Sequence, residues 1–266
     1  MFKRKVVAIT GAGSGIGRAL ALELARQGAR LALSDVNQAA LDESIALLPS
    51  GVEARAYAVD VSSRDTVFRF AADVKREFGA VHVVVNNAGT SVIASVEHLT
   101  LDEIERVLNI NLWGVIHGTK AFLPIMLGQR EGCIVNMSSV FGLVAVPAQA
   151  AYAVTKFAER GVTETLWQEL EGTGVRAVLV HPGGINTRIS NNALSARNEG
   201  DYERRLSQAF SGQMTTTPED CARQIVAGLS RGGRRLLVGN GAHAIHWISR
   251  LFPDTYGTFM RRKLGL

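Results

Sequence analysis

Three polar residues in the middle of the chain have the types and spacing needed for proton-transfer chemistry. Ser139 ends the run Ile-Val-Asn-Met-Ser-Ser, and Tyr152 and Lys156 follow it four residues apart. Residues four apart share one face of a helix. An ammonium group beside a phenol stabilises the phenolate, so we expect Lys156 to lower the pKa of Tyr152 from about 10 toward working pH. The pattern therefore predicts proton exchange at an alcohol or carbonyl oxygen, coupled to a second change at the same carbon.

The start of the chain has the pattern of a nucleotide-phosphate site. Apolar residues over 6–9 are typical of a buried parallel strand, and a turn with Gly11, Gly15 and Gly17 follows them. A helical pattern then begins at Ile16. Glycines let backbone N–H groups approach a pyrophosphate, and the positive end of the helix favours the anion. Although the spacing is GxxxGxG rather than GxGxxG, the order of strand, glycine turn and helix predicts a bound dinucleotide.

An acidic residue ends the second predicted strand, over 30–34. Asp35 lies 18 residues after Gly17, close to the spacing of about 20 expected for the acid that binds the adenosine ribose. A carboxylate at this point repels a 2′-phosphate, so Asp35 predicts NAD rather than NADP as cofactor. Arg18 is basic and nearby, which leaves NADPH as an alternative. Asp35 as a simple helix N-cap is the second interpretation.

Seven motifs occur in an order that resembles the single-domain type of the short-chain dehydrogenase/reductase family, over most of residues 5–240. In sequence order they are Thr10-Gly11 to Gly17, Asp60-Val61, Asn86 to Gly89, Asn111, Ser139, the pair Tyr152 and Lys156, and Pro182-Gly183 with Thr187. Singly, each motif has a structural interpretation, such as a surface Tyr-Lys pair or a strand-ending turn. Together they fall at the carboxyl ends of predicted strands or on the helices that follow, where open α/β sheets bind ligands.

The resemblance implies a role for each catalytic residue. Tyr152 is expected to be the general acid and base, and Ser139 to orient the substrate oxygen. Lys156 is expected to lower the pKa of Tyr152 and to hold the nicotinamide ribose. Asn111 is expected to anchor a water between Lys156 and solvent. Hydride then passes between the nicotinamide and the carbinol carbon.

The resemblance also implies where the cofactor lies. Asp60 and Val61 are expected at the adenine, the turn 86–89 against the cofactor, and Thr187 at the carboxamide or a phosphate. The expected cofactor contacts are Gly11, Ser14, Gly15, Ile16, Gly17, Asp35, Asp60, Val61, Asn87, Ala88, Gly89, Tyr152, Lys156, Pro182, Gly183, Ile185 and Thr187. No metal site is expected, because the His and Cys residues lack ligand spacing.

Alternating apolar runs and helical patterns define the expected fold class. It is an α/β fold of the Rossmann type, with a doubly wound, parallel, seven-stranded sheet covered by helices on both faces. Strands are expected near 6–10, 30–34, 54–59, 81–85, 132–138, 175–181 and 235–239. Helices are expected near 15–28, 37–48, 63–78, 100–128, 150–172, 217–230 and 242–251.

One domain is expected over residues 1–240, followed by an amphipathic tail over 241–266. By the resemblance, the polar stretch 188–216 is the substrate lid. The tail has aromatic residues that need a covering surface, so we expect it to pack on the domain or to form a subunit contact. Its basic cluster 261–263 leaves peripheral membrane contact as a less favoured alternative.

Composition limits the possible classes of protein. The chain has 266 residues, 47% of them hydrophobic, with a net charge of +5. Its basic residues are mostly scattered and accompany no nucleic-acid motif, so no nucleic-acid partner is expected. Two cysteines provide no disulfide framework. With no apolar run of about 20 residues and no signal peptide, the sequence predicts a cytoplasmic protein.

These observations predict an NAD-dependent oxidoreductase acting on a secondary alcohol or ketone. The apolar stretch 140–146 favours a hydrophobic substrate that is steroid, lipid-derived or aromatic. The alternatives are an NADPH-dependent carbonyl reductase and a non-catalytic dinucleotide-binding sensor or scaffold. By the resemblance, the predicted helices 100–128 and 150–172 form the contacts of a homodimer or homotetramer.

Overall fold

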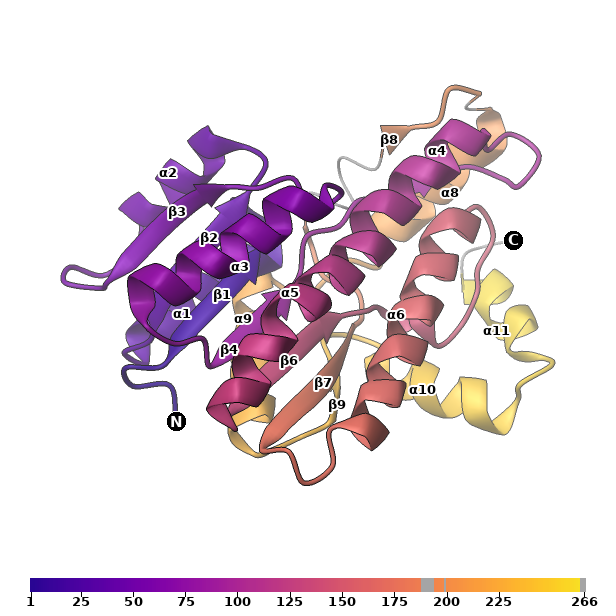
Figure 1. Cartoon of the computed structure of the whole chain (residues 1–266). Coiled ribbons are helices and arrows are strands. Elements are labelled where there is room, and N and C mark those ends of the chain that lie inside the picture. The colour runs from indigo at the N-terminus through magenta and orange to yellow at the C-terminus, as the bar shows by residue number, and fades with distance from the viewer. Residues whose placement is uncertain (188–193, 199, 264–266) are drawn as a thin grey trace.

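Seven parallel strands form the central sheet of the protein. The computed structural model describes residues 1–187, 194–198 and 200–263. The strands are β1 Val6–Thr10, β2 Arg30–Asp35, β3 Ala54–Ala58, β4 Val83–Asn86, β6 Gly132–Met137, β7 Val175–Pro182 and β9 Arg235–Val238. Their order across the sheet is β3-β2-β1-β4-β6-β7-β9, and every pairing is parallel. The predicted doubly wound sheet is therefore confirmed (Figure 1).

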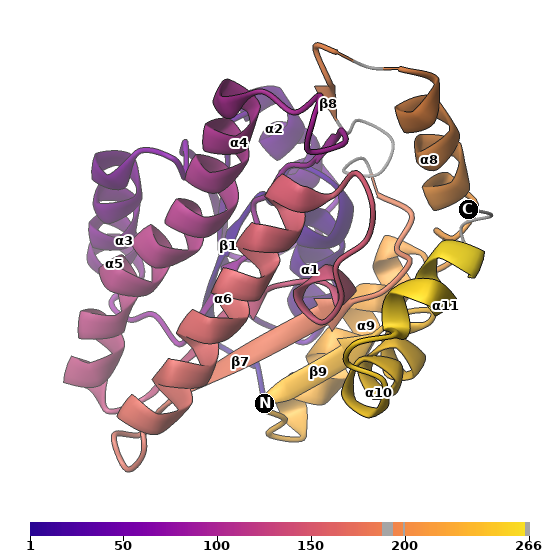
Figure 2. The same ribbon diagram turned by 90° about the vertical axis from the view of Figure 1, so that its right-hand side faces the viewer.

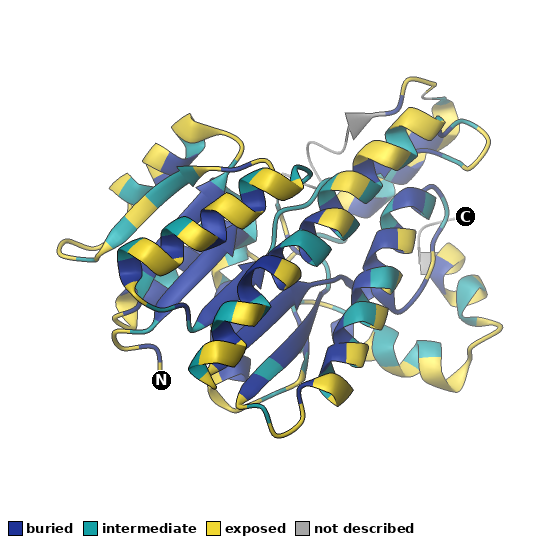
Figure 3. Ribbon diagram, viewed as in Figure 1, coloured by how far each residue is buried: buried dark blue, intermediate teal, exposed yellow. Residues whose placement is uncertain are grey.

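Helices cover both faces of this sheet, as predicted. The major helices are α1 Gly15–Arg26, α2 Gln38–Ala46, α3 Arg64–Phe78, α5 Gly114–Gln129, α6 Ala150–Glu169 and α9 Pro218–Ser230. Side chains of α1, α2 and α9 belong to one buried cluster, and side chains of α3, α5 and α6 belong to the other. Figure 3 shows the strands as the most buried layer and the outer helix faces as exposed.

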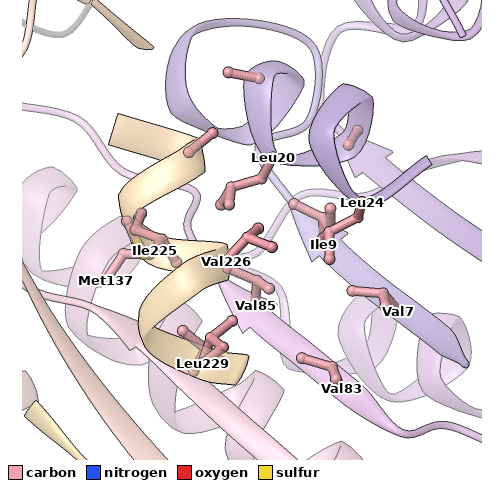
Figure 4. Close-up of a cluster of buried hydrophobic side chains, with 14 of the residues drawn as sticks. Val7, Ile9, Leu20, Leu24, Val83, Val85, Met137, Ile225, Val226 and Leu229 are labelled. Carbon is pink, nitrogen blue, oxygen red and sulfur yellow. The ribbon is translucent and has the colours of Figure 1, made fainter. Parts of the chain in front are cut away.

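The first core cluster fixes the helix that begins the glycine turn. Leu20 and Leu24 of α1 pack with Ile225 and Val226 of α9 over the apolar face of β1, which includes Ile9 (Figure 4). All five side chains are almost completely buried. This packing places the N-terminus of α1 at the carboxyl end of β1, beside the point between β1 and β4 where the winding of the sheet reverses.

The helix predicted over 100–128 is present but is not α-helical throughout. Helix α4, Leu101–Val107, leads into a π-helical turn, η1, over Leu108–Trp113, and α5 follows. Within η1, the buried side chain of Asn111 binds both backbone groups of Thr90, with its Oδ1 2.8 Å from the amide nitrogen and its Nδ2 2.9 Å from the carbonyl oxygen. The wider turn accompanies this side-chain contact at a ligand-binding edge, a common location for π-helical turns.

The C-terminal part of the chain gathers at one side of the domain (Figure 2). Helix α8, Asp201–Ser211, and the tail helices α10, Ala242–Leu251, and α11, Tyr256–Lys263, pack around the short 3₁₀ turn η2, Val140–Gly142. Sequence analysis left out α8, α11, η2 and the two-residue strands β5, Val92–Ile93, and β8, Leu194–Ser195.

Parts of the predicted lid lie outside the described residues, namely 188–193 and 199, as does the end of the tail, 264–266. In the part of the chain that the structure describes, no helix has the length and apolar character needed to cross a membrane. Cys133 and Cys221 are both free thiols in the buried core.

Candidate active site

Ser139, Tyr152 and Lys156 meet at the carboxyl end of β6. Ser139 follows β6, whereas Tyr152 and Lys156 lie in the first two turns of α6. A side-chain hydrogen bond joins Ser139 to Tyr152, and the Lys156 ammonium lies 5.3 Å from the centre of the Tyr152 ring. The three residues form one cluster, and their individual catalytic roles remain predictions.

A buried histidine supports the Ser139 end of this cluster. The His181 imidazole lies with its Nδ1 2.7 Å from the carbonyl oxygen of Ser139 and its Nε2 3.3 Å from Arg235. The carbonyl can only accept and the guanidinium can only donate, so the proton of the neutral ring belongs on Nδ1. Burial lowers the pKa of His181 to about 4, which keeps the imidazole neutral and able to hold the Ser139 backbone.

The acidity of Tyr152 differs from the sequence-based expectation. Lys156 does lower the pKa of Tyr152, and so does the hydrogen bond with Ser139. Burial has the larger effect and raises this pKa, and the nearby carboxylate of Glu159 raises it further. Lys156 thus lowers the pKa of Tyr152 as expected, but the pKa is not brought below its usual value, because burial and the Glu159 charge, which were not considered, raise it.

Lys156 has a buried partner that sequence analysis missed. Its Nζ lies 2.8 and 3.1 Å from the two carboxylate oxygens of Glu159 and 2.9 Å from the carbonyl oxygen of Met137. Burial acts to lower the pKa of Lys156, but Glu159 and Tyr152 outweigh it and raise this pKa. Burial also raises the pKa of Glu159, to about 7, against the opposing effect of Lys156. The (i, i+3) spacing of a Lys and a Glu on one helix is the signal that would have found this pair.

Asn111 is brought to the same region through the neighbouring residue of α6. Besides binding Thr90, its Nδ2 lies 3.2 Å from Thr155 Oγ1. The amide thus ties the segment after Gly89 to the turn that carries Lys156. The predicted water between Asn111 and Lys156 remains a prediction.

A groove of about 630 Å³ runs along the carboxyl ends of β1, β2 and β4. It is lined by most of the residues predicted for the adenosine and pyrophosphate: Gly11, Ser14, Gly15, Ile16, Asp35, Asp60, Val61, Asn87, Ala88, Gly89 and Thr187. Gly17 packs instead against the turn, where an added Cβ would lie 2.1 Å from the carbonyl oxygen of Gly11. Sequence analysis missed Arg106, Asn109 and Ile110, which also line the groove.

The shape and chemistry of the groove fit a dinucleotide. Gly11 has φ +66°, a conformation that favours glycine, and an added Cβ there would come 2.8 Å from Ala88. Within the described chain, the Ser14 side chain makes no capping hydrogen bond at the start of α1. The first-turn N–H groups of α1 are thus left for an anionic group such as a pyrophosphate.

Asp35 and Arg18, the two charged candidates near the adenosine site, have different surroundings. Asp35 lines the groove and accepts hydrogen bonds from the backbone N–H groups of Gly13 and Asn37. Arg18 donates to the carbonyl oxygens of Gly13 and Ala40 and to the carboxylate of Glu43. The guanidinium is therefore bound within α1 and α2, whereas the carboxylate is placed in the groove.

A second, largely apolar cavity of about 190 Å³ is lined in part by Tyr152 and adjoins the groove. Ile16, Asn87, Gly89 and Thr187 line both spaces. The apolar wall of the cavity comes from Ile93, Val140, Phe141, Val146, Phe210, Met214, Ile245 and Met260. Pro182, Gly183 and Ile185, predicted at the cofactor, also line this cavity.

An aromatic row connects the predicted lid to the catalytic cluster. Phe141 lies edge-on to Tyr152, with ring centres 6.2 Å apart, and 6.0 Å from the ring of Phe210 on α8. The tail is tied to the same wall, because the Tyr256 hydroxyl accepts a hydrogen bond of 3.1 Å from the Ala145 backbone. Among the described residues, no group of three or more His, Cys, Asp or Glu is arranged to hold a metal ion.

The open parallel sheet has a glycine-lined groove where its winding reverses, next to the Ser139, Tyr152 and Lys156 cluster. This arrangement is typical of α/β proteins that bind dinucleotides. The family model described as short chain dehydrogenase matches residues 5–198. The chain therefore belongs to the short-chain dehydrogenase/reductase family of oxidoreductases, as the resemblance implied.

Curated relatives and solved structures agree with this family. The putative oxidoreductase SadH of Mycobacterium tuberculosis is 42% identical, over 96% of this chain and 93% of its own. Estradiol 17-beta-dehydrogenase 11 of Homo sapiens is 30% identical, over 98% and 84%. A short-chain dehydrogenase/reductase of Burkholderia phymatum, solved in complex with NAD, is 30% identical with a TM-score of 0.89, covering 96% of each chain.

Proposed function

We propose that this protein is an NAD-dependent oxidoreductase that interconverts a hydrophobic secondary alcohol and its ketone. One observation carries the proposal: Tyr152 lines an apolar cavity, and this cavity adjoins a groove that has a carboxylate, Asp35, among its lining residues. That arrangement suits a reaction between an apolar substrate and a nucleotide with an unmodified ribose.

The chain supplies the proton-transfer half of the reaction. In oxidation, the Tyr152 phenolate oxygen accepts the alcohol proton while the Ser139 hydroxyl hydrogen-bonds the same oxygen. In reduction, the Tyr152 hydroxyl donates its proton to the carbonyl oxygen. General acid–base assistance of this kind contributes about 10²–10⁴-fold to the rate. When bound, the nicotinamide supplies the hydride acceptor or donor.

Asp35 supports NAD as the cofactor. Its carboxylate is placed to accept hydrogen bonds from ribose hydroxyls and to repel a 2′-phosphate. Arg18 would have to give up its contacts with Gly13, Ala40 and Glu43 to hold that phosphate. These contacts weaken the case for the NADPH-dependent alternative.

The apolar wall supports a hydrophobic substrate of the steroid, lipid-derived or aromatic kind. The name of estradiol 17-beta-dehydrogenase 11 supports the same class, since estradiol is a steroid alcohol. The presence of Ser139, Tyr152 and Lys156 in one cluster argues against a non-catalytic sensor, which needs no acid–base group.

We also propose that residues 194–198 and 200–216 are the described part of a substrate lid and that the tail completes the cavity. Subunit contacts of a homodimer or homotetramer belong to α4, η1, α5 and α6. Trp113, Val154 and Phe157 support this assignment, because these large apolar side chains are exposed on η1 and α6. Light scattering of the purified protein tests it, and a monomer would refute it.

Fluorescence titration with NADH and NADPH, followed by NAD⁺-dependent oxidation of matched alcohols, tests the proposed function. We expect tighter binding of NADH and faster oxidation of an apolar secondary alcohol than of a polyol of similar length. Tighter binding of NADPH would overturn the cofactor assignment, and a preference for the polyol would overturn the substrate class.

A further inference from the structure

A fully buried carboxylate lies next to the catalytic cluster and has no part in the proposed reaction. Glu159 is on α6, one turn after Lys156, and its side chain is 0% exposed. Both of its oxygens are within hydrogen-bond distance of Lys156 Nζ, at 2.8 and 3.1 Å. With the Met137 carbonyl oxygen at 2.9 Å, these oxygens take up the donors of the ammonium group.

Packing alone does not account for a carboxylate at this place. Burying a charge is costly unless a partner compensates for it, and an apolar side chain would fill the space without that cost. The compensating partner is Lys156, the residue whose charge acts on Tyr152. Glu159 therefore changes the electrostatic environment of the catalytic cluster.

The groups around the ion pair isolate it from other charges. Within the described residues, Lys156 and Tyr152 are the titratable groups that interact with Glu159. The other groups bound to the two residues are neutral: the Met137 carbonyl oxygen accepts from Lys156, and the Thr163 hydroxyl donates to the Glu159 backbone carbonyl. A change in the charge of Glu159 therefore acts mainly on the pKa values of Lys156 and Tyr152.

We propose that Glu159 is a positioning residue that holds Lys156 in a buried ion pair and controls how much of its positive charge reaches Tyr152. The proposal rests on the proposed function, in which Tyr152 exchanges the proton. With Glu159 ionised, the pair is neutral overall and the phenolate receives little stabilisation. The same contacts compete with any cofactor hydroxyl that takes hydrogen bonds from Lys156.

The direction of the effect follows from charge alone. Removing a negative charge makes proton release from the coupled Tyr152–Lys156 pair easier, whichever of the two groups gives up the proton. A Glu159→Gln variant keeps the shape and an acceptor oxygen for Lys156 but lacks the charge. Its phenolate is therefore formed at lower pH than that of the unaltered protein.

The test is ultraviolet absorbance of tyrosinate, measured across neutral and alkaline pH and corrected with the same protein carrying Tyr152→Phe. We expect Glu159→Gln to shift the ionisation of Tyr152 down by about one pH unit. Glu169→Gln removes an equal charge from an exposed position on α6 and should leave the titration unchanged. Coincident curves for Glu159→Gln and the unaltered protein would overturn the proposal.

A second variant and a binding measurement provide further tests of the role of Glu159. Glu159→Asp, with a shorter carboxylate, should give a smaller shift in the same direction, and this variant serves if Glu159→Gln fails to fold. In Glu159→Gln, NADH should bind a few-fold more tightly, because a neutral amide binds Lys156 less strongly than a carboxylate does. Weaker binding of NADH would refute the competition between Glu159 and the cofactor for Lys156. Absorbance needs no substrate, so loss of the proposed activity and failure of the Glu159 assignment are distinguishable.

Discussion

The groove proposed for the cofactor and the cavity proposed for the substrate share four lining residues but are built in different ways. The groove is formed by turns at the ends of β1, β2 and β4 and by η1, all within the first 113 residues apart from Thr187. The apolar wall of the cavity combines η2 with α8, α10 and α11, three helices that come much later in the sequence than η2. The groove therefore depends on backbone geometry, whereas the cavity depends on the docking of separate helices.

Tyr152 lines the cavity and not the groove, and the loss of its hydroxyl should produce the largest effect. In Tyr152→Phe, the phenyl ring still lines the cavity but cannot exchange a proton. Turnover should fall about 10²–10⁴-fold or more, while NADH binding stays within a factor of about two. Steady-state kinetics and fluorescence titration measure the two quantities.

Tyr57→Phe, on β3 and outside both cavities, is the matched control and should keep its turnover. A near-normal rate for Tyr152→Phe would remove Tyr152 from the mechanism. A large loss of NADH affinity would instead show that the phenol hydroxyl acts mainly in cofactor binding.

His181 holds the backbone of Ser139, and its effect should appear in the stability of the protein at acidic pH. Its pKa is about 4 in the native state, because of burial, and about 6.5 when unfolded. The unfolded chain therefore takes up a proton first, so the stability that depends on neutral His181 is present above pH 6.5 and is lost as pH falls toward 4. The difference amounts to about 3 kcal/mol.

Denaturant unfolding of His181→Asn at several pH values checks this prediction. The variant should be less stable than the unaltered protein at neutral pH and should lose less stability between pH 6.5 and pH 4. His243→Asn, an exposed change on α10, should keep the full pH dependence. If the free energy of unfolding depends on pH equally in the two variants, His181 is not the group that causes the loss of stability at acidic pH.

A substitution of Asp35 tests whether this one carboxylate makes the groove prefer NADH over NADPH. Asp35→Ala removes both the ribose acceptor and the repulsion of a 2′-phosphate, so the ratio of NADH to NADPH affinity should fall about 10-fold to 100-fold. With a substrate that fits the cavity, the oxidation rate of Asp35→Ala should change only because the cofactor binds with a different affinity.

Asp42→Ala, exposed on the neighbouring helix α2, carries the same charge change away from the groove and should keep the ratio. Because Asp35 also binds the Gly13 backbone, Asp35→Asn is useful as a milder variant. A ratio that does not move in either Asp35 variant would mean that this carboxylate does not contact the ribose.

Phe210 lines the cavity but not the groove, so a substitution there affects the cavity alone. It should have the smallest effect of the four. Phe210→Ala removes one apolar side chain from the wall, so KM for a bulky alcohol should rise about 10-fold while NADH affinity stays the same. Phe68→Ala, an exposed aromatic on α3, is the control. Equal KM values for the two variants would place the substrate elsewhere.

Sequence reasoning succeeded where backbone geometry determines the structure. Gly11 and Asp35 stand at fixed distances from the first strand, and both line the groove. The parallel sheet was likewise predictable, because each apolar run was followed by a helical pattern. These signals are local, so one sequence is sufficient to find them.

The remaining features depend on long-range packing. Met260 and Phe141 meet in one apolar cluster although they are more than 100 residues apart, and no periodic pattern indicates that pairing. The π-helical turn depends on Asn111 reaching Thr90, which helical periodicity does not encode. The raised pKa of Tyr152 could not be predicted either, because burial is known only once the chain is folded.

The position of the tail against η2 has an evolutionary consequence. Ile245 and Met260 shape the cavity from helices whose residues do not line the groove. Substitutions in this segment can therefore alter which alcohols are accepted while the nucleotide chemistry stays intact. Gene duplicates that differ mainly in α10 and α11 could acquire new substrates by this route, with the catalytic machinery inherited unchanged.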